Sequence, residues 1–156
     1  MRERLTQWIL AAILAVLASA AVPAPLRGGV PQKLDRSDLR IGSYAGQVHQ
    51  VATAKTDGTT VEDDLPFRLT ILRIEADGTV QARVVIQRHS GDIAGSIDAQ
   101  NRLHLEGTLT HSALPGTWVF KLDALAKDDK LVEGTYTKVS DKIASRGTFR
   151  KATLER

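Results

Sequence analysis

Cysteine is absent from the 156-residue chain, and aromatic residues make up only 4% of it. Without cysteine the protein has no disulfide, no thiolate metal site, no cysteine nucleophile and no lipid-modified cysteine. The 21 basic residues outnumber the 18 acidic ones, a net charge of +3. That excess is small and few aromatic side chains could stack on bases, so the composition does not predict a nucleic-acid-binding protein. The chain length corresponds to one domain of ordinary size.

Sequence motifs for catalysis are also missing. The segment Gly42–Gly46, GSYAG, places its serine one position too early for the Gly-x-Ser-x-Gly turn of a nucleophilic serine. The acidic clusters Glu62–Asp64 and Asp128–Asp129, which we place in loops, lack the spacing of a calcium-binding loop. The sequence therefore predicts no catalytic residue, no cofactor and no metal site, and we do not expect an enzyme.

The first 22 residues have the pattern of an export signal. Arg2 and Arg4 precede the apolar run Ile9–Val22, and Ala18-Ser19-Ala20 fits a cleavage site of small residues. No charged residue lies between Arg4 and Arg27. This uncharged segment is also long enough for an uncleaved transmembrane anchor. Residues 1–22 are thus predicted to be a hydrophobic helix, either a signal peptide or an anchor. In both cases the rest of the chain is exported.

The remainder divides into a linker and one domain. Residues 23–38 are rich in proline, glycine and charge, which predicts a linker, and residues 39–156 are predicted to form the exported domain. The only asparagine, Asn101, is not in a glycosylation sequon, and arginine outnumbers lysine 13 to 8. With the absence of cysteine, these features favour a bacterial periplasmic or membrane-anchored protein whose domain lies outside the cytoplasm.

The domain sequence predicts an all-β fold. Strand-like segments with alternating apolar and polar residues are separated by turn signals such as Asp77-Gly78 and Ser90-Gly91. A change of phase around Arg73 predicts a bulge. Strands that are apolar on one side and joined by hairpins predict an eight-stranded antiparallel up-and-down barrel, with a β-sandwich as the alternative. The segments are 41–54, 67–75, 79–88, 92–98, 102–110, 117–124, 131–139 and 146–153.

A glycine followed by serine or threonine and then a large residue recurs along these segments. The clearest cases are Gly42-Ser43-Tyr44, Gly134-Thr135-Tyr136 and Gly147-Thr148-Phe149. We expect their aromatic rings to cover glycines inside the barrel. The same motifs resemble those of the avidin and lipocalin class of calycin-type barrels. The resemblance spans residues 41–153 and implies an eight-stranded barrel that holds a small ligand inside.

Two sets of residues are candidates for binding. Five aromatic residues are expected to line one end of the barrel as the wall of an apolar pocket: Tyr44, Trp118, Phe120, Tyr136 and Phe149. Four arginines fall on one predicted hairpin, either as a surface for an anionic partner or as an ordinary solvated face: Arg68, Arg73, Arg83 and Arg88.

The function predicted from these features is that of a non-catalytic accessory subunit. It would be exported or tethered to the membrane by its N-terminal segment, and would bind a protein partner in an envelope or membrane complex. The alternative is lipocalin-like binding of a small apolar ligand inside the barrel.

Overall fold

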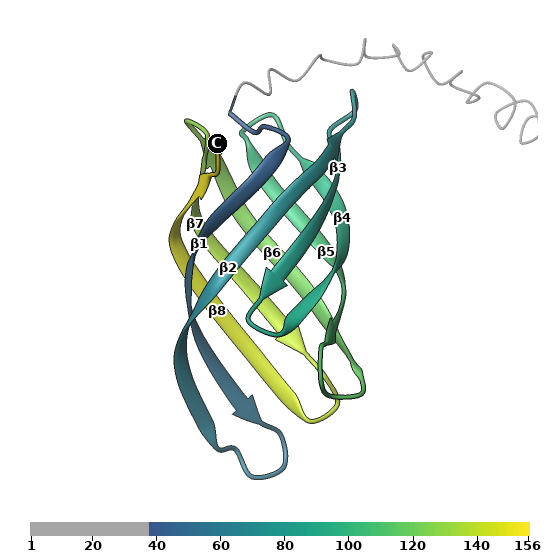
Figure 1. Cartoon of the computed structure of the whole chain (residues 1–156), viewed down its shortest axis with the longest axis vertical. Helices are drawn as coiled ribbons and strands as arrows, with labels where there is room; N and C mark the ends of the chain where they lie inside the picture. The colour runs from purple at the N-terminus through teal and green to yellow at the C-terminus, as the bar shows by residue number, and fades with distance from the viewer. Residues whose placement is uncertain (1–37) are drawn as a thin grey trace, which may run out of the picture. The chain divides into compact units, whose positions relative to one another are not determined.

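The computed structural model describes residues 38–156, which form an eight-stranded β-barrel (Figure 1). The predicted signal peptide or anchor over residues 1–22, and all but the last residue of the predicted linker, lie outside the described residues. No helix within residues 38–156 is long and apolar enough to cross a membrane.

The strands follow one another around the barrel in sequence order, and β8 pairs with β1 to close it. Every neighbouring pair is antiparallel, so the predicted up-and-down barrel is confirmed and the sandwich alternative is not adopted. Closure removes the exposed edge strands that an open sheet would have. The strands are β1 Gly42–Ala54, β2 Thr60–Ile74, β3 Thr79–Ile86, β4 His89–Ile97, β5 Arg102–His111, β6 Thr117–Lys127, β7 Lys130–Val139 and β8 Ile143–Leu154.

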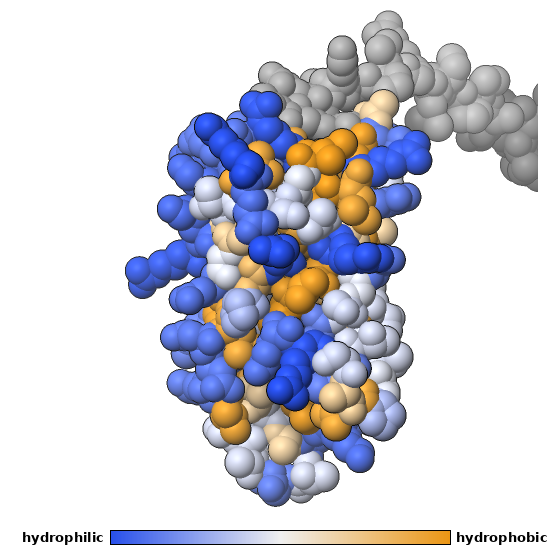
Figure 2. All heavy atoms as spheres, viewed as in Figure 1, coloured by the Kyte–Doolittle hydropathy of each residue, from blue (hydrophilic) through white to orange (hydrophobic). Residues whose placement is uncertain are grey.

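Alternation along each strand determines which side chains fill the interior. On β3, Val80, Ala82, Val84 and Ile86 are buried, and the residues between them are exposed. The expected inward residues of β5 and β6 are buried in the same way, as are Phe67, Leu69 and Ile71 of β2. Leu72, which was expected to face inward after the change of phase, is instead 51% exposed. The core is therefore the barrel interior itself. The face shown in Figure 2 is mainly hydrophilic, with apolar atoms between the polar side chains.

Two predicted loops are strand in the structure. Strand β2 begins at Thr60, so Glu62–Asp64 lies within it, and Asp64 is opposite His49 on β1 with 3.0 Å between its Oδ1 and the histidine Nδ1. The predicted turn at Ser90-Gly91 is also wrong, because Ser90 pairs with Val85 and the ladder continues to Ile86. The turn occurs instead at Gln87 and Arg88, where Gln87 takes a φ of 54° without any glycine.

The predicted bulge on β2 is confirmed, since the register with β3 shifts between Ile71 and Arg73. A second irregularity, which the sequence analysis did not predict, occurs on β7. There Glu133 has a φ of 52°, and Leu131 and Gly134 are both buried. The extra residue reverses the alternation, so Tyr136 and Lys138 face inward on the rest of the strand.

Aromatic rings cover glycines on the neighbouring strand, as expected. Phe149 lies opposite Gly134, and Tyr136 lies opposite Gly147. A Cβ atom added to either glycine would overlap the facing ring. The glycines of this motif therefore make room for rings that fill the barrel.

The two ends of the barrel differ in chemistry. One end, here called the terminal end, lies beside the C-terminus, and the buried Leu39 just before β1 belongs to the core. Tyr44 fixes the segment before β1 there, because its hydroxyl contacts the backbone nitrogen and oxygen of Arg40 at 2.9 and 3.2 Å. The other end, here called the mouth, is bounded by the turns at residues 55–59, 87–88, 112–116 and 140–142. Polar side chains enter the interior at the mouth.

Candidate functional site at the barrel mouth

A group of polar and aromatic side chains occupies the interior near the mouth, and we call it the mouth cluster. Its members come from β1 and from β4 to β8, and all but the two histidines are buried. The mouth cluster consists of Gln50, His89, His111, Trp118, Tyr136, Lys138 and Ser145.

Lys138 is the central feature of this cluster. The residue is only 3% exposed, because the reversed alternation on β7 turns its side chain into the barrel. Its Nζ lies 3.3 Å from Nδ1 of His89, at the start of β4. No carboxylate forms a salt bridge with it among residues 38–156. Burial lowers the pKa of Lys138 to about 8, so at neutral pH the ammonium is mostly charged inside the barrel.

His89 is held neutral beside this cation. Burial, together with the smaller effects of the nearby Lys138 and His111 charges, lowers the pKa of His89 to about 4. A charged Lys138 has only donors, so it donates to His89 Nδ1, and the histidine proton is on Nε2. The His89 ring contacts Trp118 and His111 edge-on, with centroid distances of 4.7 and 4.8 Å. His89 and Trp118 therefore lie between Lys138 and the loops of the mouth.

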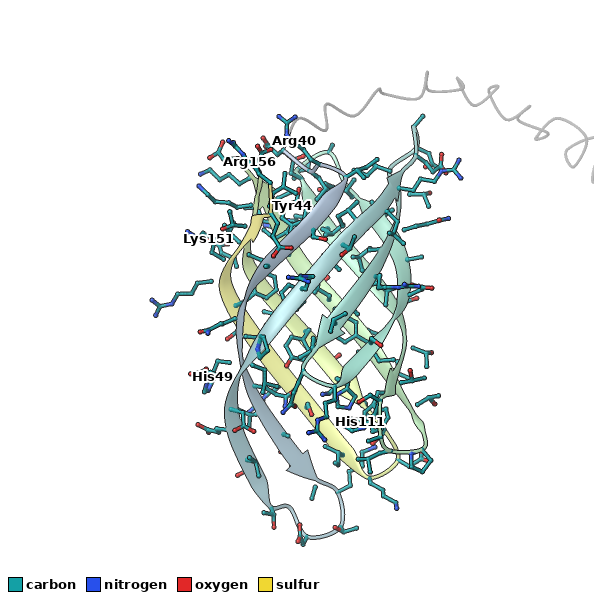
Figure 3. All side chains as sticks on the ribbon, viewed as in Figure 1. Arg40, Tyr44, His49, His111, Lys151 and Arg156 are labelled. Carbon is teal, nitrogen blue, oxygen red and sulfur yellow. The ribbon has the colours of Figure 1, made fainter. Side chains whose placement is uncertain are left out.

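His111 shapes the loop between β5 and β6. Its Nδ1 accepts hydrogen bonds from the backbone N–H groups of Ala113 and Leu114, both at 3.0 Å. Like His89, it is therefore neutral and carries its proton on Nε2. Figure 3 shows His111 near the mouth, at the opposite end of the barrel from Tyr44 and Arg40.

Two further hydrogen-bond donors are buried on β8 and β1. Ser145 is 4% exposed and is the register partner of Lys138 on β8, and its hydroxyl has no side-chain hydrogen bond within residues 38–156. Gln50 accepts a hydrogen bond from the Tyr136 hydroxyl at 2.8 Å. That bond uses the oxygen of the amide and leaves its NH₂ group without a partner in the described structure. Burial also raises the pKa of Tyr136, which stays protonated and donates.

An apolar groove of about 380 Å³ opens beside the cluster. The loop between β5 and β6 forms one side with Leu114 and Pro115, and the turn between β7 and β8 forms the other with Ser140 and Ile143. Trp118 lines this groove and also contacts His89. The groove thus leads from the surface to the aromatic side of the mouth cluster.

The five aromatic residues predicted to line one end are distributed along the barrel instead. Tyr44 lies near the terminal end, whereas Trp118 is in the mouth cluster. Phe149 stacks on Phe67 with a centroid distance of 5.0 Å, and Phe120 packs on Tyr136 at 5.6 Å. All five are buried, so the structure brings together only parts of the predicted set.

The four predicted arginines are exposed on β2, β3 and the following turn. Three of them contact carboxylates: Arg68 binds Glu155 at 3.0 Å, Arg73 binds Glu75 at 2.6 Å, and Arg83 holds both oxygens of Asp92 at 2.7 and 3.1 Å. These pairs neutralise much of the positive charge that an anionic partner would meet.

Five members of the mouth cluster were missed from the sequence: Gln50, His89, His111, Lys138 and Ser145. Gln50 lies an even number of residues from Tyr44 on β1, and Ser145 lies an even number from Phe149 on β8. Alternation along each strand could therefore have predicted that both face inward. His89 was hidden by the predicted turn at Ser90-Gly91. Lys138 could not be found by alternation from Leu131, because the irregularity at Glu133 intervenes. Among the residues that the structure describes, no three His, Asp or Glu side chains are placed to hold a metal ion.

The chain was compared with models of protein families, with curated proteins and with solved structures, and none of them matches it.

Proposed function

We propose that this chain is a non-catalytic exported β-barrel that acts as an interaction subunit of an envelope or membrane complex, and that it contacts an apolar protein surface through the mouth. The observation that carries the proposal is a group of exposed apolar side chains around the groove, here called the apolar rim: Leu114, Val119, Val139 and Ile143.

The rim joins the groove to the outer face of two strands. Leu114 and Val119 are each 58% exposed, and Val119 is the register partner of Val139 across β6 and β7. Apolar side chains gathered around a groove are typical of interaction sites, whereas single exposed ones are not. The described chain begins at Asp38, at the terminal end.

A non-catalytic role is supported by the chemistry of the mouth cluster. Ser145 and Lys138 are buried neighbours, but no hydrogen bond joins them among the described residues. Without that bond the lysine does not activate the serine as a nucleophile. We also propose that the domain resembles the avidin and lipocalin class of barrels, and its closed eight-stranded up-and-down architecture supports this resemblance.

The test is native mass spectrometry of the full-length protein, extracted gently from its own source. Leu114→Glu is expected to reduce the fraction bound to a protein partner by about tenfold or more, because it places a charge in the apolar contact. Leu72→Glu is the matched control, since Leu72 is 51% exposed but lies on β2 away from the rim. Retention of the partner by the Leu114 variant, or equal loss in both variants, would contradict docking through the rim.

A second candidate function is the binding of a small ligand in the barrel. The specific observation in its favour is the set of buried donors in the mouth cluster that have no acceptor among residues 38–156. Such donors cost free energy unless something accepts their hydrogen bonds. Because Phe67, Phe120 and Phe149 fill the middle of the barrel, a ligand would be held at the mouth.

A further inference from the structure

We propose that the mouth cluster is a binding site for a single carboxylate group, with the Lys138 ammonium as the charged donor and Ser145 and Gln50 as neutral donors. The inference rests on the second candidate function, ligand binding in the barrel, and names the chemical class of that ligand.

The first argument is the balance of donors and acceptors around Lys138. An ammonium has three protons, and His89 Nδ1 accepts one of them. The hydroxyl of Ser145 and the amide NH₂ of Gln50 add donors that no described acceptor satisfies. Gln50 and Ser145 lie on the adjoining strands β1 and β8, and Ser145 lies directly across from Lys138. An anion with several acceptor sites would satisfy this set.

The second argument is charge. Tyr136 and His89 also face this region and are uncharged at neutral pH, because burial raises the pKa of Tyr136 and lowers that of His89. His111 faces it too, with Nδ1 accepting two backbone hydrogen bonds. Asp63 on β2 pairs in register with Gln50, but it is exposed and forms no salt bridge with Lys138. Lys138 is thus the one charge buried in the mouth cluster, which fits a monovalent anion better than a phosphate dianion.

The third argument is access. From Thr60 to Pro66, β2 pairs with β1 but not with β3, so the barrel wall is incomplete at this corner of the mouth. In Figure 1 the hairpin of β1 and β2 projects beyond the neighbouring strands. On the other side the groove reaches Trp118, which contacts His89. His89 and His111 are themselves partly exposed, so a small group that enters need only displace their side chains.

The chemistry also distinguishes two sources of the carboxylate. A small hydrophilic acid would bind through the donors alone. An acid with an apolar tail would also contact the groove beside Trp118 and Ile143, and would bind more tightly for each CH₂ group that it buries. Acetate and hexanoate separate these two cases, and hexanol has the same tail as hexanoate without the charge.

The test follows the Lys138 signal in the full-length protein labelled with ¹³C-lysine, by NMR. The chain has eight lysines, and Lys138→Met identifies the signal that belongs to Lys138. We expect acetate and hexanoate to shift this signal and to raise the pH at which it titrates, because a bound anion stabilises the ammonium. We expect hexanol to do neither. Lys138→Met should weaken hexanoate binding by about tenfold or more.

A matched pair of variants tests the neutral donors. Ser145→Ala is expected to weaken acetate and hexanoate binding, whereas Ser96→Ala, on the exposed face of β4, is expected to leave both unchanged. A much tighter binding of hexanoate than of acetate would identify an acid with an apolar tail as the ligand. Equal affinities would identify a small hydrophilic acid.

Two results would overturn the inference in different ways. If hexanol binds as tightly as hexanoate, and Lys138→Met changes neither affinity, the barrel binds a ligand but the mouth cluster is not a carboxylate site. If none of the three molecules binds, the second candidate function fails together with the inference. Circular dichroism of each variant is the check that the barrel has folded.

Discussion

Burying an ammonium group without a carboxylate partner costs free energy, because the charge loses its hydration, and Lys138 is such a group. Its pKa falls from 10.5 to about 8 on burial, and each pKa unit corresponds to roughly 1.4 kcal/mol. The charge therefore destabilises the free protein by roughly 3 kcal/mol at neutral pH. Folding alone does not account for this cost, which is consistent with the proposed role of Lys138 in binding.

This leads to a prediction for Lys138→Met. A methionine has a similar length and no charge, so it removes the desolvation penalty but also the hydrogen bond to His89. We expect a net gain of about 1–2 kcal/mol in the free energy of unfolding at neutral pH, measured by urea denaturation. A loss of stability instead would mean that the ammonium is well compensated in the free protein.

At the scale of the strands, glycines and rings on neighbouring strands fit together. Tyr136 lies over Gly147 of β8 and donates from its hydroxyl to Gln50 on β1, the next strand around the barrel. Phe149 fills the space opposite Gly134 in the same way. These contacts position the inner face of β7 and β8, and hence Lys138 and Ser145, which follow on the same strands.

Gly147→Ala tests this fit. The added methyl group would overlap the Tyr136 ring, which must move and lose its hydrogen bond to Gln50. We expect a loss of about 1–3 kcal/mol in stability, the usual range for overpacking a core. Gly58→Ala is the control for the loss of a glycine, because no atom lies near its added Cβ, although its φ of +73° adds backbone strain. Thermal melts of both variants would show a smaller loss for Gly58 if the ring contact is the cause.

At the scale of the whole molecule, the barrel is a closed sheet whose mouth holds the polar side chains of the interior cluster. Closure by β1 and β8 makes every strand internal, and the interior is dense enough to hold the fold without disulfides. The buried Lys138 and the partly buried His89, whose pKa values burial lowers, both lie at the mouth. The pH dependence of the whole barrel should therefore show their titration.

His89 and Lys138 each have a lower pKa in the folded protein than in the unfolded chain. Between the two pKa values of each residue, the unfolded chain therefore binds more protons than the folded protein, and stability rises with pH. Stability is expected to fall as the pH drops from 6.5 to about 4, where only unfolded chains carry the His89 charge. It is expected to rise as the pH increases from about 8 to 10.5, where the folded protein loses the Lys138 charge first. Urea midpoints across both windows measure this, and Lys138→Met should remove the alkaline rise. If the stability of the unmodified protein does not change between about pH 8 and 10.5, Lys138 does not carry a buried charge at neutral pH.

Much of the fold could be predicted from the sequence. Alternation of apolar residues is a local property, so it was enough to predict eight strands, the inward faces of β3, β5 and β6, the bulge near Arg73 and closure into a barrel. The ends of the strands were harder to predict where the local residue types disfavour a strand but the neighbouring strand pairs with them. Glu62–Asp64 read as a loop because acidic residues are uncommon in strands, yet β1 continues far enough to pair with them.

The proposed binding site depended on tertiary structure. The sequence by itself determined the export signal pattern, the all-β fold and the absence of recognised catalytic motifs, since these follow from composition and short-range spacing. Only the folded chain decided which polar residues meet. A single irregular residue, Glu133, turned Lys138 inward, and barrel closure brought β7, β8, β1 and β4 around it. Side chains that come from strands far apart in the sequence share no local pattern, so their meeting at the mouth became visible only in three dimensions.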